Sequence, residues 1–390
     1  MYNPQASFRN ILSPIKLDDF FARDYEKNAL HIPGPIDKFE GLFDWSDLNR
    51  CLEFSQTWDS HNVKMVLDGE PIPPIRYCPE GILDRSLVAD FLDQGATLVL
   101  VGFETLSDGT SSLSKSIQAA TGGLVCGNLY FSQKGHAGFK PHFDTQEVFV
   151  IQIAGEKTWK IYESQFEHPM LIPGFHQMSF PREFHDQNMG AIETEVTLTP
   201  GDVIYLPRGK YHAAVATSNT SLHLSFGAEL PRGFDYLQSI VETIPNDPVF
   251  REAIPHYDDV EAHRIYLNKL AERFSEKMKE TGMINDMRTL QRQRALGNFP
   301  MFSLPKSTRP SGYRVRVAGS KFVKRGKSGQ LKTAISKIDI SPEMVKIVEW
   351  ILLSDLFSLD DLKSAFSQLD DNQCGKVIFE LTDAGLIEKF

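Results

Sequence analysis

The sequence predicts a mixed, β-rich chain in which an antiparallel barrel or sandwich is followed by a helical region and a small C-terminal module. Eight short runs rich in β-branched and aromatic residues lie between residues 96 and 230, separated by Gly, Pro, Asn and Asp. After Pro231 the apolar residues recur at spacings of three and four, which is the helical period. The length of 390 residues favours two or three domains over one.

The elements follow in this order. Residues 1–95 mix short helical and loop-like segments, and residues 111–123 predict a helix that ends on a pair of glycines. Residues 165–192 form an insertion without clear periodicity. Residues 258–296 are long for one helix, so two helices broken near Gly282 are expected. The predicted strands are 96–103, 124–132, 147–155, 157–163, 193–199, 202–207, 212–217 and 221–230.

The C-terminal part combines short alternating strands with three helical segments. The strands fall in the basic stretch 306–337, Pro342 opens the first helix, and residues 358–368 carry a second apolar stripe. Helices beside a small sheet are the composition of a winged helix. We therefore expect three parts, at residues 1–230, 231–300 and 301–390.

The amino-acid composition is that of an ordinary globular protein. Hydrophobic residues make up 41% and charged residues 24%, as in globular proteins. The four cysteines are widely scattered, which predicts free thiols in a reducing compartment. The N-terminal sequence lacks the features of a secretory signal, and no apolar run approaches the roughly 20 residues that span a bilayer. A cytoplasmic protein without membrane contact is expected.

The charge is unevenly distributed. The net charge is −10, but residues 306–337 contain ten Lys or Arg and no acidic residue, which leaves a net charge of −20 on the rest. An acidic surface disfavours broad nucleic-acid binding and suits a basic partner. Solubility alone explains it equally well.

A metal site is the first functional prediction. His142 and Asp144 are two residues apart at the start of a predicted strand, so both side chains point to one face and Phe143 to the other. A third ligand, His212, opens a later strand within the turn-rich frame that begins at Gly201 and Asp202. Two imidazoles and one carboxylate form the facial triad of non-haem Fe(II) oxygenases.

The simpler explanation is that His142 caps a strand and that His212 is a satisfied core histidine. Each alone would deserve that explanation, but the joint pattern in the β-rich region favours a metal site. Lys157 supports the prediction of a functional site here. This lysine directly follows the turn at Ala154 and Gly155. It is expected to start a strand antiparallel to the one that carries His142 and to point into the barrel, where a lysine needs an anion. From spacing alone, a surface lysine in a hairpin is equally plausible.

The sequence resembles a known family in the stretch from Asn128 to Glu163 and again around PGDVIYLPRGKYH, residues 200–212. Both closely resemble the JmjC ribosomal oxygenases, which have a double-stranded β-helix (cupin or jelly-roll) barrel. The resemblance implies that His142, Asp144 and His212 bind Fe(II) and that Lys157 binds 2-oxoglutarate, with O2 as the second cosubstrate. It also implies that Asn128 and Tyr130 line the cosubstrate pocket. Ser225 is the nearest candidate for an assisting hydroxyl group.

The resemblance extends to the other parts of the chain. It implies a catalytic barrel at residues 1–230, a helical dimerisation domain at 231–300 and a winged helix at 301–390. The implied reaction is hydroxylation of a side chain of a ribosomal protein, arginine being favoured and histidine the alternative. The implied partners are a basic protein or peptide substrate and a second copy of the chain.

Three other functions remain open. A peptide-tailoring hydroxylase would have the same site, and a JmjC lysine demethylase would use the same iron chemistry. A cupin that binds metal without turnover, or a winged-helix regulator, would need no cosubstrate. Lys157, Asn128 and Tyr130 favour the enzyme. Isolated histidines near the barrel are better explained as loop or core residues: His168, His176, His185 and His223.

Overall fold

The computed structural model describes the greater part of the chain. The described residues are 6–53, 58–136, 138–241, 244–280, 283–284, 286–289, 291, 312–315, 321–325, 328–333, 337–354 and 356–389. The chain divides into two compact units, one of Met1–Glu229 with Asp355–Phe357 and the other of Leu230–Ser354 with Ser358–Phe390. The division into three domains that we expect from the sequence stays a prediction.

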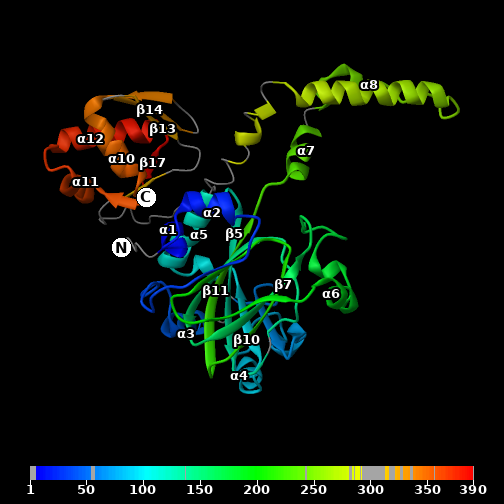
Figure 1. Cartoon of the computed structure of the whole chain (residues 1–390), viewed down its shortest axis with the longest axis vertical. Coiled ribbons are helices and arrows are strands. Elements are labelled where there is room, and N and C mark those ends of the chain that lie inside the picture. The colour runs from blue at the N-terminus through cyan, green and yellow to red at the C-terminus, as the bar shows by residue number, and fades with distance from the viewer. Residues whose placement is uncertain are drawn as a thin grey trace. The chain divides into compact units, whose positions relative to one another are not determined.

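A large sheet forms the centre of the first unit (Figure 1). Its eight strands have the order β1-β9-β6-β11-β5-β4-β2-β3, and all of its pairings are antiparallel. The longest pairing joins β5 and β11 over ten residues, with Asn128 opposite Ser225 and Tyr130 opposite His223. The strands are β1 (Leu30–Ile32), β2 (Val63–Leu67), β3 (Glu70–Pro71), β4 (Thr97–Val101), β5 (Leu124–Gln133), β6 (Glu147–Ala154), β9 (Val203–Leu206) and β11 (Thr220–Glu229).

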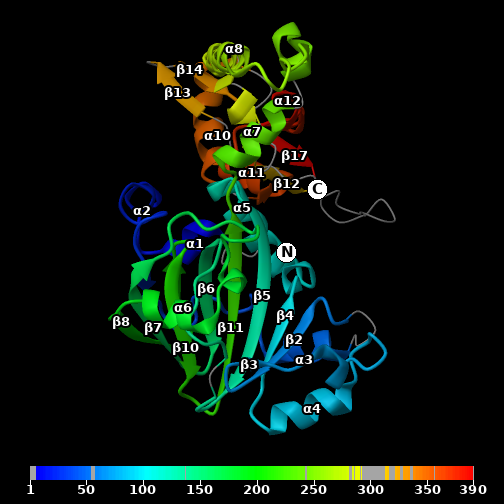
Figure 2. The same cartoon turned by 90° about the vertical axis from the view of Figure 1, so that its right-hand side faces the viewer.

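A smaller sheet packs against part of the large one. It contains β7 (Lys157–Gln165), β8 (Ile192–Leu198) and β10 (Lys210–Ala216) in the order β10-β7-β8. Apolar side chains of both sheets form one buried cluster, to which β6 contributes Val150 and β7 contributes Trp159. The two antiparallel sheets share a core, as the two sheets of a jelly-roll do, and Figure 2 shows strands of both sheets. The predicted β-rich fold is confirmed.

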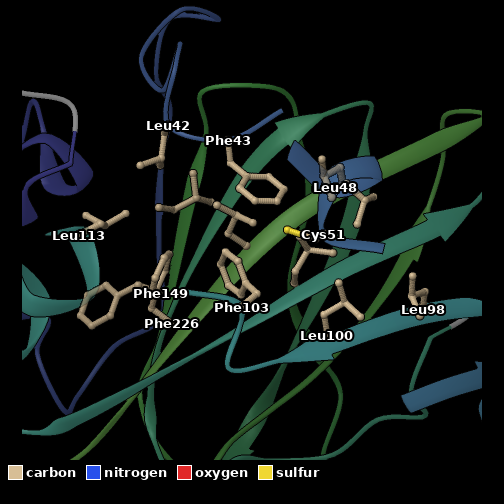
Figure 3. Close-up of a cluster of buried hydrophobic side chains, with 14 of the residues drawn as sticks. Leu42, Phe43, Leu48, Cys51, Leu98, Leu100, Phe103, Leu113, Phe149 and Phe226 are labelled. Atoms are coloured by element: carbon tan, nitrogen blue, oxygen red, sulfur yellow. The ribbon is translucent and has the colours of Figure 1, made fainter. Parts of the chain in front are cut away.

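Helices cover the other face of the large sheet, where the main core lies. Phe149 and Phe226 from the sheet meet Phe103 and Leu113 in a buried cluster, part of which Figure 3 shows. The helix expected at residues 111–123 is present and begins three residues earlier; Ser107 caps its start, and Gly122 ends it at φ +74°. The helices are α1 (Phe8–Leu12), α2 (Leu17–Arg23), α3 (Trp45–Glu53), α4 (Arg85–Asp93) and α5 (Asp108–Thr121), with short 3₁₀ turns at Pro74–Arg76 and Phe103–Thr105.

One strand pairing that we expect from the sequence is wrong. The strand that begins at Lys157 does not form a hairpin with the strand before it, because β6 pairs with β9 and β11 whereas β7 pairs with β8 and β10. The turn between them crosses from one sheet to the other. Gly155 is needed there at φ +63°, since a Cβ atom would lie 1.9 Å from the Thr220 carbonyl oxygen.

The second unit contains helices and small sheets. The helix α8 covers part of the predicted segment 258–296, and the break expected near Gly282 lies outside the described residues. Two antiparallel sets of short strands follow, β12 with β17 and β13-β14-β15. Its elements are α7 (Gly233–Val241), the 3₁₀ turns Ile244–Asn246 and Pro248–Arg251, α8 (Val260–Met278), β12 (Gly312–Val315), β13 (Lys321–Arg325), β14 (Ser328–Lys332), β15 (Lys337–Ile340), α10 (Pro342–Leu352), α11 (Leu359–Ala365), α12 (Asp371–Asp383) and β17 (Ile387–Lys389). The strand β16 (Leu356–Ser358) is divided, since Leu356 and Phe357 belong to the first unit.

Among the described residues, no helix has both the length and the apolar character that crossing a bilayer requires.

Candidate metal and cosubstrate site

The three predicted ligands come together at the edge of the small sheet. His142 forms an antiparallel bridge with His212, and the two residues exchange backbone N–H···O hydrogen bonds of 3.1 and 2.8 Å. His212 is the third residue of β10, whereas His142 and Asp144 lie in an extended segment just ahead of β6 rather than in the strand itself. Side chains still alternate there, because Phe143 is fully buried in a separate aromatic cluster.

The side chains converge on the Asp144 carboxylate. The Nε2 atom of His212 lies 3.5 Å from one carboxylate oxygen, and the Nε2 atom of His142 lies 3.9 Å from the other. One ligand atom from each of the three residues lies within 4.8 Å of the other two. This is the only such group of His, Cys, Asp or Glu in the part of the chain that the structure describes.

Backbone carbonyl groups fix the tautomers of both histidines. His142 Nδ1 lies 2.8 Å from the Lys140 carbonyl oxygen, and His212 Nδ1 lies 3.0 Å from the Lys210 carbonyl oxygen. A carbonyl only accepts, so each Nδ1 carries the proton and donates it. Each Nε2 is therefore left with its lone pair directed at the shared site, as metal binding requires.

The turn before β10 is held in place by its glycine. The Gly209 N–H donates to the Asp144 carbonyl at 2.8 Å, and the Gly209 carbonyl accepts from the Phe166 N–H at 2.8 Å. Its φ of +83° and the Phe166 carbonyl, 2.0 Å from where a Cβ would stand, both require glycine. Asp202 fixes the preceding turn by accepting from the Gly34 and Thr199 N–H groups. These contacts explain why Asp202 and Gly209 occur in the turns that precede His212.

The site is sealed on one side and open on the other. The side chain of His212 is 7% exposed, whereas those of His142 and Asp144 are 24% and 31% exposed. Burial, and secondly the neighbouring His142, lower the pKa of His212 to about 4, although Asp144 acts in the opposite direction. His212 is thus neutral near pH 7, and the two exposed ligands leave the open side accessible.

Lys157 reaches the interior from the small sheet. Its side chain is buried, and its ammonium group donates to the Ser132 hydroxyl of β5 at 2.9 Å. No acidic side chain among the described residues forms an ion pair with it, and burial lowers its pKa to about 7. A buried cation without a counter-ion fits an anionic ligand. The alternative of a surface lysine is wrong.

The other predicted pocket residues lie on the interior face of the large sheet. Asn128 is opposite Ser225, and Tyr130 is stacked on His223 with ring centroids 4.6 Å apart and planes at 5°. The Lys157 ammonium group lies 5.9 Å from the Tyr130 ring centroid. The structure thus brings Tyr130 close to Lys157 and places Asn128 and Ser225 side by side, two residues further along the same pair of strands.

Sequence reasoning missed several polar residues on this interior face. Ser132 continues the alternation of Asn128 and Tyr130, and that spacing was the available signal. Gln152 donates to the Ser221 hydroxyl at 2.9 Å.

His223, which the sequence predicts to be a loop or core residue, is buried on the same face, and burial lowers its pKa.

The residues present fit Fe(II) and 2-oxoglutarate. Two imidazole nitrogens and a carboxylate suit Fe(II), and the buried ammonium group of Lys157 suits the distal carboxylate of a dicarboxylic acid. Several buried polar atoms between the sheets have no hydrogen-bond partner, and a polar ligand would satisfy them. They are Asn128 Oδ1, Gln152 Oε1, Trp159 Nε1 and His223 Nδ1.

Comparisons with known proteins show which domain family and which relatives the sequence is similar to. Residues 104–236 match the family model of the JmjC domain. Ribosomal oxygenase 2 of Mus musculus is 28% identical over 57% of this chain and 47% of its own length. A bifunctional lysine-specific demethylase and histidyl-hydroxylase NO66 of Branchiostoma floridae is 26% identical over 64% of this chain and 38% of its length. The chain thus spans less than half the length of these two relatives.

The fold has a solved counterpart. The ribosomal oxygenase YcfD of Escherichia coli, solved in complex with cobalt and 2-oxoglutarate, aligns with a TM-score of 0.54 over 96% of this chain and 98% of YcfD. The two sequences are 15% identical, so this likeness concerns the fold alone.

Proposed function

Because the chain carries a JmjC domain of the ribosomal oxygenase family, we propose that it is an Fe(II)- and 2-oxoglutarate-dependent dioxygenase that hydroxylates a protein side chain. One observation carries the proposal. The convergent His142, Asp144 and His212 share an interior with a buried Lys157 that has no acidic partner among the described residues. A metal-binding protein without turnover needs no such lysine.

Each residue has a role in this reaction. His142, Asp144 and His212 hold the iron, and Lys157 anchors the distal carboxylate of the cosubstrate with Ser132 beside it. Asn128 and Tyr130 line the cosubstrate pocket, with Ser225 next to Asn128. Bound iron, together with 2-oxoglutarate and O2, supplies the oxidising power. The buried side of the site keeps water away from these groups.

The proposed substrate is a basic ribosomal protein, with arginine favoured as the hydroxylated residue and histidine as the alternative. The acidic chain outside residues 306–337 suits such a partner, and the names of the relatives point to ribosomal substrates. We further propose a cytoplasmic homodimer that pairs through residues 231–300 and does not bind nucleic acid directly.

The activity is tested by measuring succinate formed from 2-oxoglutarate by the iron-loaded protein. Asp144→Ala should abolish succinate formation, because it removes the only carboxylate ligand. Glu195→Ala is a matched control, since Glu195 is an exposed acid on β8 that pairs with the partly exposed Lys160. Full turnover by the Asp144 variant would contradict the proposal.

The substrate is tested by mass spectrometry of ribosomal proteins from cells with the wild-type enzyme or with the Asp144 variant. The expected result is one peptide that gains the mass of one oxygen atom only with the wild type. Loss of a methyl group from lysine instead would identify a demethylase. Modification confined to a non-ribosomal peptide would overturn the ribosomal assignment.

A further inference from the structure

We propose that residues 166–191, which we name the clamp segment, position the metal ligands by contacts on the side opposite to the metal. His185 and Arg182 are the positioning residues. The inference rests on the proposed metal centre but not on turnover. The starting observation is that few backbone contacts join the segments that carry the metal ligands. The ligand-bearing segments of His142 and His212 are joined by an isolated bridge and by the hydrogen bond from Gly209 to Asp144 rather than by a continuous strand pairing.

The clamp segment covers the face of these segments that is opposite to the metal. Phe143 lies between two ligands in sequence and Tyr211 directly precedes the third, and both are fully buried in one cluster with Tyr162. Phe166 of the clamp segment stacks on Phe143 with ring centroids 4.6 Å apart and planes at 10°. Phe180 packs on Phe166 at 5.5 Å. The clamp segment therefore contacts both ligand-bearing segments.

His185 holds the segment that carries His212. It lies in α6 (Arg182–Asn188) and is 6% exposed. Its Nε2 lies 2.9 Å from the Gln177 carbonyl oxygen, so Nε2 carries the proton. Burial lowers the pKa of His185, which leaves its Nδ1 as an acceptor for the Tyr211 hydroxyl at 3.1 Å. This bond fixes the residue next to His212.

Arg182 holds the segment that carries His142. Its guanidinium group donates to the Pro141 carbonyl at 2.6 Å and to Asp186, one helical turn further on, at 2.9 Å. Pro141 directly precedes His142. One short helix thus binds the residue before each of the two histidine ligands, which relates their backbones to each other. Small ligand displacements weaken metal sites, so such support bears on affinity.

The test measures cobalt(II) affinity by titrating the metal-free full chain and following visible absorption, with thermal unfolding of the metal-free protein measured in parallel. Tyr211→Phe removes only the hydroxyl group that binds His185. Tyr77→Phe is the matched control, because Tyr77 is equally buried in the same unit and its hydroxyl donates to the Val63 carbonyl at 3.2 Å. For Arg182→Met the control is Arg264→Met, an arginine paired with Glu261 within α8.

Tyr211→Phe and Arg182→Met should each weaken cobalt binding about tenfold, as the loss of supporting contacts does at other metal sites. Both controls should bind cobalt like the wild type, and the two tyrosine variants should unfold at similar temperatures. Unchanged affinity in the Tyr211 and Arg182 variants would overturn the inference, and so would an equal loss in the controls. A wild-type chain that binds cobalt but forms no succinate would refute the proposed activity without contradicting the inference about the clamp segment.

Discussion

The role that we propose for Lys157 predicts that cosubstrate binding depends on pH. In the free protein its pKa is about 7, and a bound carboxylate needs the protonated form. As pH rises above 7, less of the free protein carries the ammonium group. We therefore expect 2-oxoglutarate affinity to fall up to about tenfold per pH unit between pH 7 and 9. Calorimetric titration across this range measures the effect. Lys157→Arg should flatten the profile, because guanidinium stays charged, and an equally steep profile in that variant would refute the assignment.

Glu147 makes folding stability depend on pH. It is fully buried, and burial raises its pKa to about 7 although the Tyr205 hydroxyl and Arg208 act in the opposite direction. The folded state then holds a proton that the unfolded state releases near pH 4.5, so this contribution to stability is lost as pH rises from about 4.5 through 7.

Glu147→Gln cannot ionise and should gain stability relative to the wild type as pH rises from 5 to 8. Urea unfolding at several pH values measures this change. The exposed Glu193→Gln should leave the pH dependence as it is, and parallel profiles for Glu147→Gln and the wild type would contradict the explanation.

At the scale of elements, the turn before β10 decides where His212 lies. Gly209→Ala combines a strained positive φ with a clash against the Phe166 carbonyl, and we expect a loss of more than about 2 kcal/mol of unfolding free energy together with weaker cobalt binding. Gly81→Ala is the control, because Gly81 lies outside the clamp segment and has a φ of +80° with no atom near its Cβ position. It should lose only about 1 kcal/mol and bind cobalt normally. Equal effects of the two substitutions would mean that the contact with Phe166 is unimportant.

The elements also show what the sequence could predict. The alternation of side chains within one strand is local, and it placed His142 and Asp144 on one face and Phe143 on the other. Strand partners are not local. Lys157 follows a two-residue turn that looks like a hairpin, but the chain crosses to the other sheet there, because the apolar faces of β6 and β7 meet across the core. The supporting contact of His185 with Tyr211 also joins distant segments, so an isolated histidine in an insertion gave no signal.

For the whole molecule, α8 bears on the proposed dimer. This helix of 19 residues has no buried residue within one chain, and Val260 and Leu267, seven residues apart on one face, are 78% and 63% exposed. Covering such apolar side chains favours association. We expect light scattering at micromolar concentration to give the mass of two chains and Leu267→Glu to give one. Asn268→Glu, on the same helix, should stay dimeric, whereas a monomeric wild type would contradict the proposal.

The reciprocal bridge between His142 and His212 also makes the metal centre observable without any metal. Each of these residues donates its amide proton to the other, so one local opening exposes both amides to solvent together. Their hydrogen exchange rates should therefore be similar and should rise together when the bridge is weakened. Deuterium uptake at this one residue pair would report how often the two ligand-bearing segments separate in the metal-free protein.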